Sequence, residues 1–175
     1  MDAARQAGAN GFITKPLFRS RLVYKLKQFI SGAAVEKPES VMLIGGSYEG
    51  KRILLAEDNA LNREIAVEIL SEAGVVTDTA ENGQIAVDMV KNAPSGTYDL
   101  IFMDMQMPVM DGCTAAEQIR ALPREDTKGL PIIAMTANAF ADDRQKTRDA
   151  GMNGHLAKPL DLDQLRRVLE KWLST

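Results

Sequence analysis

Short apolar stretches alternate with amphipathic stretches over most of this chain. Each apolar stretch is bounded by polar or turn-forming residues, which is typical of strands. The predicted strands are Arg52–Ala56, Val75–Thr79, Leu100–Asp104, Ile132–Thr136 and His155–Ala157. The predicted helices are Ala60–Ala73, Gln84–Asn92, Thr114–Leu122, Asp142–Ala150 and a last one that begins after Asp161, with Gln164 completing a capping box. This alternation predicts an α/β fold, a doubly wound parallel sheet with helices on both faces.

A short internal repeat indicates how the chain is organised. Residues 7–17 and 150–160 are identical at seven of eleven positions, and an amphipathic helical pattern follows each copy. We therefore expect residues 1–30 to be the βα tail of one domain, residues 31–50 to be a linker, and residues 51–175 to be a complete second copy. Thirty residues cannot bury a core alone, so the first fragment should pack on the complete domain or on its equivalent in a second molecule.

Composition and charge narrow the classes of function. Residues 51–175 hold fourteen basic and twenty acidic side chains, a net charge of −6, which argues against nucleic acid as a partner. Residues 1–30 hold six basic side chains and one acid, a balance that most often marks a solvated face. No apolar run is long enough to span a membrane, so we expect no membrane partner. The single cysteine, Cys113, fits a reducing compartment, and we expect a cytoplasmic location.

Polar side chains gather where the predicted strands end. Glu57 and Asp58 follow the first strand, Asp104 ends the third, Thr136 and Ala137 end the fourth, and Lys158 follows the fifth. In a doubly wound sheet these carboxyl ends form one rim, which is where ligands bind. Three carboxylates placed together repel one another unless a cation lies among them, and oxygen ligands of this kind suit Mg²⁺. A carboxylate beside a metal, an ammonium group and a hydroxyl could stabilise the charge of a transferring phosphoryl group.

Four ordered segments carry a resemblance to a known family. They are Ala56-Glu57-Asp58-Asn59, Asp104-Met105-Gln106-Met107-Pro108-Val109-Met110-Asp111-Gly112, Thr136-Ala137-Asn138 and Lys158-Pro159. Together they resemble the motif set of response-regulator receiver domains, above all the C-terminal receivers of hybrid sensor histidine kinases. The resemblance covers about 125 residues, and the N-terminal repeat then looks like the tail of a second, truncated receiver.

The resemblance implies a fold and a role for each motif residue. The fold would be flavodoxin-like, with five parallel strands in the order 2-1-3-4-5. Asp104 would be the phosphoacceptor, and Mg²⁺ would bind Glu57, Asp58, Asp104 and the backbone carbonyl of Gln106. Thr136 and the Ala137 amide would contact phosphoryl oxygens. Lys158 would pair with the acyl phosphate, and its peptide bond to Pro159 would be cis.

The resemblance also implies partners and a switch. The phosphodonor would be a histidine kinase or a histidine phosphotransfer domain, and the chain would assist its own phosphorylation and dephosphorylation. Movement of Thr136 would be coupled to an aromatic residue at position 155 and so to the surface of helix 142–150, strand 155–157 and the last helix. His155 departs from the usual Tyr or Phe, whereas the N-terminal copy has Phe12 there. A homodimer could form through that surface or through residues 1–30.

Three other functions compete with this interpretation. A flavin-binding protein of the same topology would need a phosphate-binding loop after the first strand, where this chain has the acidic pair Glu57 and Asp58. An aspartyl-phosphate phosphatase would carry its nucleophile on the first strand and would have a cap domain. A receiver kept only as an interaction module ranks last, because no motif residue is missing here, but the sequence alone leaves this alternative open.

Overall fold

The computed structural model describes residues 48–137 and 141–174. The chain divides into two compact units, Met1–Val41 and Met42–Thr175, and every described residue belongs to the second. The predictions made for residues 1–30, and nearly all of the predicted linker, therefore lie outside the described residues.

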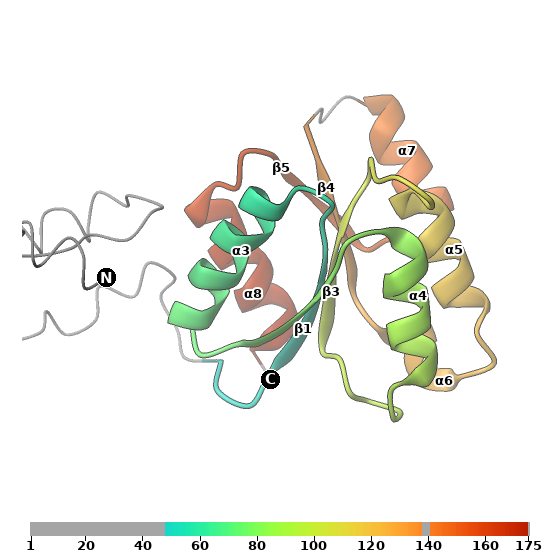
Figure 1. The fold of residues 1–175 in the computed structure, drawn as a ribbon, viewed down its shortest axis with the longest axis horizontal. Coiled ribbons are helices and arrows are strands. Elements are labelled where there is room, and N and C mark those ends of the chain that lie inside the picture. The colour runs from blue at the N-terminus through green and yellow to red at the C-terminus, as the bar shows by residue number, and fades with distance from the viewer. Residues whose placement is uncertain (1–47, 138–140, 175) are drawn as a thin grey trace, which may run out of the picture. The chain divides into compact units, whose positions relative to one another are not determined.

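Five parallel strands form one sheet in the order β2-β1-β3-β4-β5, which confirms the predicted topology (Figure 1). The strands are β1 (Arg52–Ala56), β2 (Val76–Ala80), β3 (Leu100–Asp104), β4 (Ile132–Thr136) and β5 (Gly154–Ala157). The bounds predicted for β1, β3 and β4 are confirmed. These central strands are apolar along almost their whole length, as strands covered on both faces must be.

The prediction placed the start of β2 one residue too early, and the reason lies at the end of the preceding helix. Gly74 has a φ of 81°, and the Val75 amide donates a hydrogen bond of 3.2 Å to the Leu70 carbonyl. This bond closes the last helical turn in the manner of a Schellman motif, so Val75 still belongs to the helix end. The strand therefore begins at Val76, whose amide pairs with the Lys51 carbonyl.

Helices cover both faces of the sheet, with α3 and α8 on one face and α4, α5 and α7 on the other (Figure 1). Their bounds are α3 (Ala60–Glu72), α4 (Gly83–Asn92), α5 (Gly112–Ala121), α6 (Glu125–Gly129), α7 (Ala141–Asp149) and α8 (Leu162–Leu173). Side chains of Asn59, Asn82, Asp111 and Asp161 cap the N-termini of α3, α4, α5 and α8. The predicted cap at Asp161 is confirmed by its 2.9 Å bond from the Gln164 amide.

The prediction of five helices after residue 51 is wrong, because the described residues also contain α6. This helix has five residues, too few for a 3.6-residue periodicity to show in the sequence. Tertiary contacts hold it in place: the Arg124 guanidinium bonds to Asp126 at 2.7 Å and to the carbonyls of Val90 and Ala93 at the end of α4.

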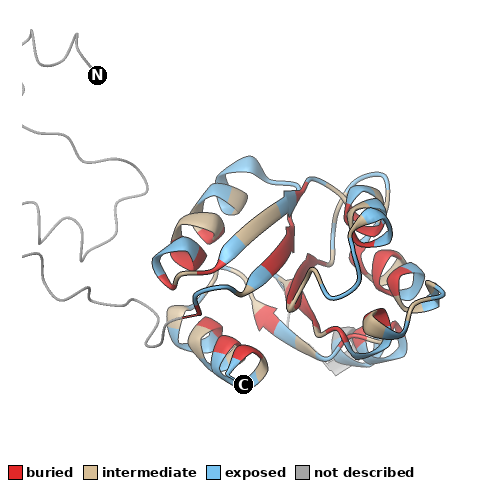
Figure 2. Ribbon diagram, turned by 90° about the horizontal axis from the view of Figure 1, so that it is seen from below, coloured by how far each residue is buried: buried red, intermediate tan, exposed pale blue. Residues whose placement is uncertain are grey.

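The core lies between the central strands and the helices that cover them, and Figure 2 shows the buried residues there in red. All five residues of β3 are buried, including its last residue, Asp104. Behind Asp104 the chain turns into α5 through Gly112, where a Cβ atom would overlap the Asp104 carbonyl oxygen. Glycine is therefore required at this position for the loop to close against the end of β3.

Candidate functional site

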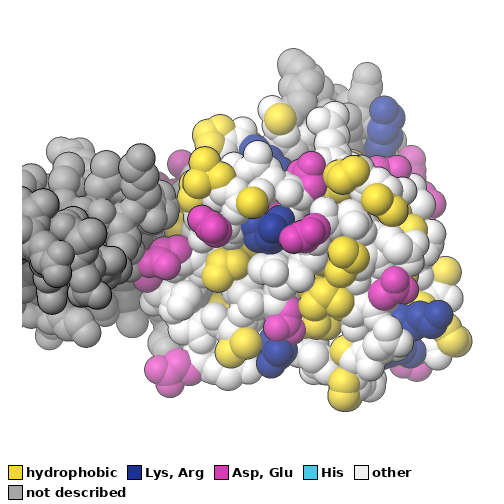
Figure 3. Space-filling model, in the orientation of Figure 1, with side chains coloured by type: hydrophobic (Ala, Val, Ile, Leu, Met, Phe, Trp, Pro, Cys, Tyr) yellow, Lys and Arg dark blue, Asp and Glu magenta, His cyan; other side chains and the backbone are white. Residues whose placement is uncertain are grey.

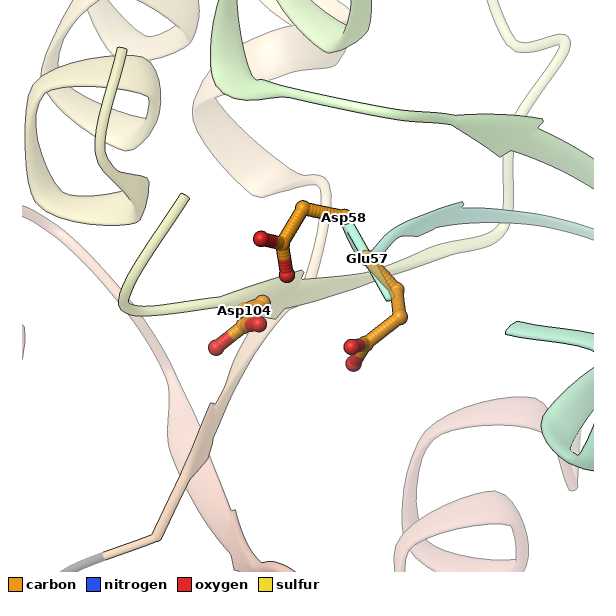
Figure 4. Close-up of side chains that lie close together, drawn as sticks. All are labelled: Glu57, Asp58 and Asp104. Atoms are coloured by element: carbon orange, nitrogen blue, oxygen red, sulfur yellow. The ribbon is translucent and has the colours of Figure 1, made fainter. Parts of the chain in front are cut away.

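The predicted site residues meet at the carboxyl end of the sheet. Glu57 and Asp58 follow β1, Asp104 ends β3, and their side chains lie close together (Figure 4). One carboxylate oxygen from each of the three lies within 4.8 Å of the others. Glu57 and Asp104 are buried, whereas Asp58 is exposed and forms the open side of the cluster.

One cation lies among these carboxylates. The Lys158 Nζ lies 2.6 Å from Glu57 Oε2 and 2.6 Å from Asp104 Oδ2. The cis peptide bond between Lys158 and Pro159, which the resemblance implied, is present. Three carboxylates with one ammonium group leave two negative charges uncompensated within the cluster, and burial makes such an excess unfavourable.

Burial and partners act against each other on the ionisation of this cluster. Burial raises the pKa of Asp104, and this effect outweighs its hydrogen bonds from Lys158 and from the Gln106 amide, which lower it; nearby Glu57 raises it further. Burial lowers the pKa of Lys158, but its hydrogen bonds to Asp104 and Glu57 prevail, so the net shift is upward. Folding therefore favours the charged form of Lys158 and disfavours the charged form of Asp104.

Two residues that the sequence analysis did not single out hold Glu57 in place. The Asn62 side-chain amide donates to Glu57 Oε1 at 3.1 Å. The Arg63 guanidinium donates to the Glu57 carbonyl at 2.8 Å and contacts Glu81 at 3.2 Å. Both residues lie in the first turn of α3, three and four positions after the cap Asn59, so their side chains reach back to the strand end. The sequence signal for this support was the position of the two polar residues three and four places after the helix cap.

The loop after Asp104 is held by backbone contacts. The Gln106 amide donates to Asp104 Oδ1 at 3.2 Å, and the Met105 amide donates to the Met135 carbonyl at 3.0 Å. Val109 has a φ of 69°, a left-handed conformation that is costly for a β-branched residue, and its side chain is 84% exposed. Strain of this kind beside a buried acid is typical of functional loops.

Thr136 and Ala137 lie at the neighbouring strand end. Asp104 pairs in register with Met135, so Thr136 is one residue farther toward the rim, and its carbonyl accepts a 2.8 Å bond from the Lys158 amide. His155 lies on β5 opposite Ala134, and its side chain is exposed. Burial lowers the pKa of His155, and the positive charges of Arg144 and Arg148 lower it further. The structure thus brings Glu57, Asp58, Asp104 and Lys158 together and places His155 at a separate location on β5.

Comparison with known proteins identifies the family. The response regulator receiver domain family matches residues 53–170, and this chain belongs to it. The receiver domain of the sensor histidine kinase PA1611 from Pseudomonas aeruginosa PAO1, solved with magnesium in its active-site cleft, is 39% identical with a TM-score of 0.64. That match covers 72% of this chain and 99% of the other.

Two further relatives support the same family. Two-component system protein A from Emericella nidulans is 43% identical over 126 residues, covering 71% of this chain and 18% of that protein. The receiver of Saccharomyces cerevisiae Ssk1, solved with the histidine phosphotransfer protein Ypd1, is 34% identical with a TM-score of 0.64, covering 71% of this chain and 89% of the other.

This chain corresponds to only a small part of each of its first curated relatives. The first curated relatives include several hybrid histidine kinases, and this chain spans between 5% and 18% of their length. Some alignments cover 90% or more of this chain and therefore include residues before 48. Within residues 48–137 and 141–174, no helix is long and apolar enough to cross a lipid bilayer.

Proposed function

We propose that this receiver domain accepts a phosphoryl group on Asp104 from a phosphohistidine donor. One observation carries the proposal: Asp104 is a buried carboxylate that ends a central strand between two further acids and a lysine at 2.6 Å. Glu57 also lies 2.6 Å from Lys158, but its other carboxylate oxygen accepts hydrogen bonds from the Asn62 side chain and the Asn59 amide, so we assign the acceptor role to Asp104. Membership of a two-component signalling family supports the proposal.

Mg²⁺ fits the donor set at this site. The ligands offered are hard carboxylate oxygens from Glu57, Asp58 and Asp104 within 4.8 Å of one another, and the exposed position of Asp58 leaves room for water. The backbone carbonyl of Gln106 is the fourth ligand in this proposal. Bound Mg²⁺ would neutralise the excess negative charge of the carboxylates and of the incoming phosphoryl group.

The chain's own residues would position and stabilise the transferring group. A carboxylate oxygen of Asp104 forms the new O–P bond as the P–N bond of the donor breaks, and the electron pair of that bond stays on the imidazole nitrogen. Lys158, already held by Asp104 and Glu57, turns its charge toward the phosphoryl oxygens. The Thr136 hydroxyl and the Ala137 amide contact the remaining oxygens, so that positioning and charge neutralisation carry the reaction.

The phosphorylated state would act through the neighbouring strands. Thr136 pairs in register with Ala157, two residues after His155 on β5. Movement of Thr136 toward the phosphoryl group would therefore reach the surface formed by α7, β5 and α8. Hydrolysis of the acyl phosphate at the same site would return the domain to its resting state, so the chain would assist its own phosphorylation and dephosphorylation.

The donor we propose is a histidine kinase or a histidine phosphotransfer domain. The complex of the Ssk1 receiver with Ypd1 supports the second of these. The parent protein would be a hybrid histidine kinase, because several relatives of which this chain spans a small part are such kinases. We place the domain in the cytoplasm, which the single cysteine, Cys113, supports.

Residues 1–30 would be the tail of a second, truncated receiver, followed by a linker at residues 31–50 and the receiver domain at residues 51–175. The repeat at residues 7–17 supports this division, as do alignments that extend before residue 48. The fragment keeps a Lys-Pro dipeptide but has no acidic pair, so we propose that it does not accept a phosphoryl group. We propose that it instead joins two molecules of this chain into a dimer. Sedimentation of the full chain should give a dimer, and deletion of residues 1–45 should give a monomer. A full chain that stays monomeric at high micromolar concentration would contradict this.

The phosphoacceptor proposal is tested by intact-mass spectrometry after incubation with acetyl phosphate. The wild type should gain one phosphoryl group in the presence of Mg²⁺ and none after chelation with EDTA. Asp104→Asn should gain none, whereas the control Asp99→Asn should behave like the wild type. Equal labelling of Asp104→Asn and the wild type would overturn the assignment.

A further inference from the structure

The three carboxylates of the cluster differ in what holds their side chains. Those of Glu57 and Asp104 accept hydrogen bonds, and both pair with Lys158. No described residue forms a hydrogen bond or an ion pair with the carboxylate of Asp58, which is exposed. The direction of the Asp58 side chain therefore depends on the conformation of its own backbone.

The backbone must turn at Asp58 if two consecutive acids are to face one cation. In an extended chain, successive side chains point to opposite sides. Here β1 ends at Ala56, and the chain bends at Asp58 before α3 begins at Ala60. With this bend, oxygens of Glu57 and Asp58 lie within 4.8 Å of each other and of an oxygen of Asp104. The bend is therefore what allows Asp58 to belong to the cluster.

The Arg63 side chain bonds to the peptide groups on both sides of Asp58. Its Nη1 donates to the Glu57 carbonyl at 2.8 Å and to the Asp58 carbonyl at 3.3 Å. These carbonyls belong to the planar peptide groups before and after the Asp58 Cα, so holding both restricts both backbone dihedrals of Asp58. Among the described residues, no backbone amide donates to either carbonyl. The bend thus depends on Arg63.

The guanidinium of Arg63 is itself held from a second direction. Its Nη2 donates to Glu81 Oε1 at 3.2 Å. The Arg63 backbone amide also bonds to the Asn59 carbonyl at 3.0 Å, in the first turn of α3. A planar guanidinium can bond to the carbonyls and to the carboxylate at once, whereas the ammonium group of a lysine is a point charge on a flexible stem. This position therefore calls for arginine in particular.

We propose that Arg63 is a positioning residue for the metal site, because it fixes the bend that aims the Asp58 carboxylate at the cation. Arg63 acts through the backbone: its contacts are with two carbonyl oxygens and with Glu81, not with the carboxylates of the cluster. This inference rests on the proposed Mg²⁺ site.

The positive charge of Arg63, taken alone, would have the opposite effect on metal binding. A cation close to a cation site repels Mg²⁺, so removal of the charge alone should raise the affinity for Mg²⁺. Loss of positioning should lower that affinity by about tenfold, as loss of groups that orient metal ligands does. The direction of the change therefore distinguishes positioning from electrostatics.

Isothermal titration calorimetry with MgCl₂ tests the proposal on the full chain without phosphodonor. Arg63→Met removes the charge and the donors but keeps a long side chain, and Arg63→Lys keeps only the charge. The control, Arg52→Met, removes an arginine that forms two hydrogen bonds with Asp78 at the other end of the sheet. Circular dichroism checks that each variant is folded.

Both Arg63 variants should bind Mg²⁺ about tenfold more weakly than the wild type, and the control should bind it equally well. Because Arg63 acts through Asp58, Arg63→Met should cause little further loss in the Asp58→Asn background. Wild-type or higher affinity in either Arg63 variant, or an equal further loss in that background, would overturn the inference alone. A wild type that binds no Mg²⁺ would remove the proposed metal site and this inference with it.

Stability separates positioning from a purely structural role. Without Mg²⁺, Arg63→Met and Arg52→Met should both lower the free energy of unfolding, since both lose hydrogen bonds. At one fixed concentration, Mg²⁺ should stabilise the wild type and Arg52→Met equally but Arg63→Met less, because the gain depends on affinity. Urea denaturation measures these gains. Equal gains in all three proteins would show that Arg63 only supports the fold.

Discussion

Two polar clusters lie toward opposite ends of the same sheet, and their charges are organised differently. Toward the amino ends, Arg52 contacts Asp78 through two hydrogen bonds of 2.8 and 2.9 Å, and Lys51 lies 3.3 Å from Asp99. Each acid there has its own cation. At the carboxyl ends, three acids cluster around one cation, Lys158, which pairs with two of them, Glu57 and Asp104. On the face seen in Figure 3, basic side chains lie next to acidic ones, as they do in the cluster toward the amino ends.

The ionisation of two aspartates shows what this difference means. The hydrogen bonds from Arg52 lower the pKa of Asp78, even though burial acts in the opposite direction. Burial raises the pKa of Asp104, although Lys158 is 2.6 Å away. A balanced cluster stabilises the fold, whereas an unbalanced and buried one calls for a further cation. Charge imbalance at the rim therefore distinguishes the ligand site from a structural cluster made of the same residue types.

Neutralising an acid of the unbalanced cluster should have the largest effect on metal binding. Asp58→Asn should lower Mg²⁺ affinity by about tenfold or more, because one of three carboxylate ligands is lost. Asp78→Asn, in the balanced cluster, should leave Mg²⁺ affinity unchanged. Isothermal titration calorimetry with MgCl₂ measures both. Similar losses in the two variants would mean that overall charge, and not the rim cluster, sets the affinity.

Removing one cation from each cluster should lower the free energy of unfolding by different amounts. Lys158→Ala leaves Glu57 and Asp104 buried without their partner and should lower the free energy of unfolding by about 3 kcal/mol. Lys51→Ala breaks a partly exposed pair and should cost less than about 1 kcal/mol. Urea denaturation at neutral pH gives both values, and Mg²⁺ should restore part of the loss in Lys158→Ala only. Equal costs without any rescue by Mg²⁺ would contradict this account.

The two aspartates should also give opposite pH dependences of stability. The pKa of Asp104 is raised above 3.8 by folding, so its ionisation makes the fold less stable as pH rises above that value. The pKa of Asp78 is lowered below 3.8, so its contribution is present above that pH and is lost as pH falls through the folded value. Without Mg²⁺, Asp104→Asn should therefore gain stability over the wild type as pH rises from about 4 to about 7. Asp78→Asn should be less stable than the wild type above 3.8 and approach it only below that value. Thermal unfolding across this range checks both signs, and a fall for Asp104→Asn would refute the first.

The sequence predicted those structural features that depend on residues close to one another along the chain. Uninterrupted apolar runs predicted β1, β3 and β4 with correct bounds, and the residues after them predicted which side chains meet at the rim. The support of Glu57 by Asn62 and Arg63 was missed because it depends on how α3 leaves the strand. Helix α6 was missed because it depends on tertiary contacts between segments distant in sequence.

The smallest expected effect concerns His155, which belongs to neither cluster. Burial and the charges of Arg144 and Arg148 lower its pKa below 6.5, so the unfolded chain takes up a proton first as pH falls. The wild type should therefore lose stability relative to His155→Phe between about pH 7.5 and about pH 5.5, and the two should differ little above 6.5. Denaturant midpoints at the two pH values measure the difference. A relative gain by the wild type at low pH would show that the ring is stabilised in its charged form.

The central claim is that the unbalanced cluster accepts a phosphoryl group on one specific acid, Asp104. Sodium borohydride reduces an acyl phosphate to an alcohol, so treatment after incubation with acetyl phosphate and Mg²⁺ converts a phosphorylated aspartate into homoserine. Tandem mass spectrometry of the digested protein then shows which residue was modified. We predict homoserine at position 104 and nowhere else, and only when Mg²⁺ is present. Modification at Glu57, Asp58 or Asp78, or none at all, would contradict the account.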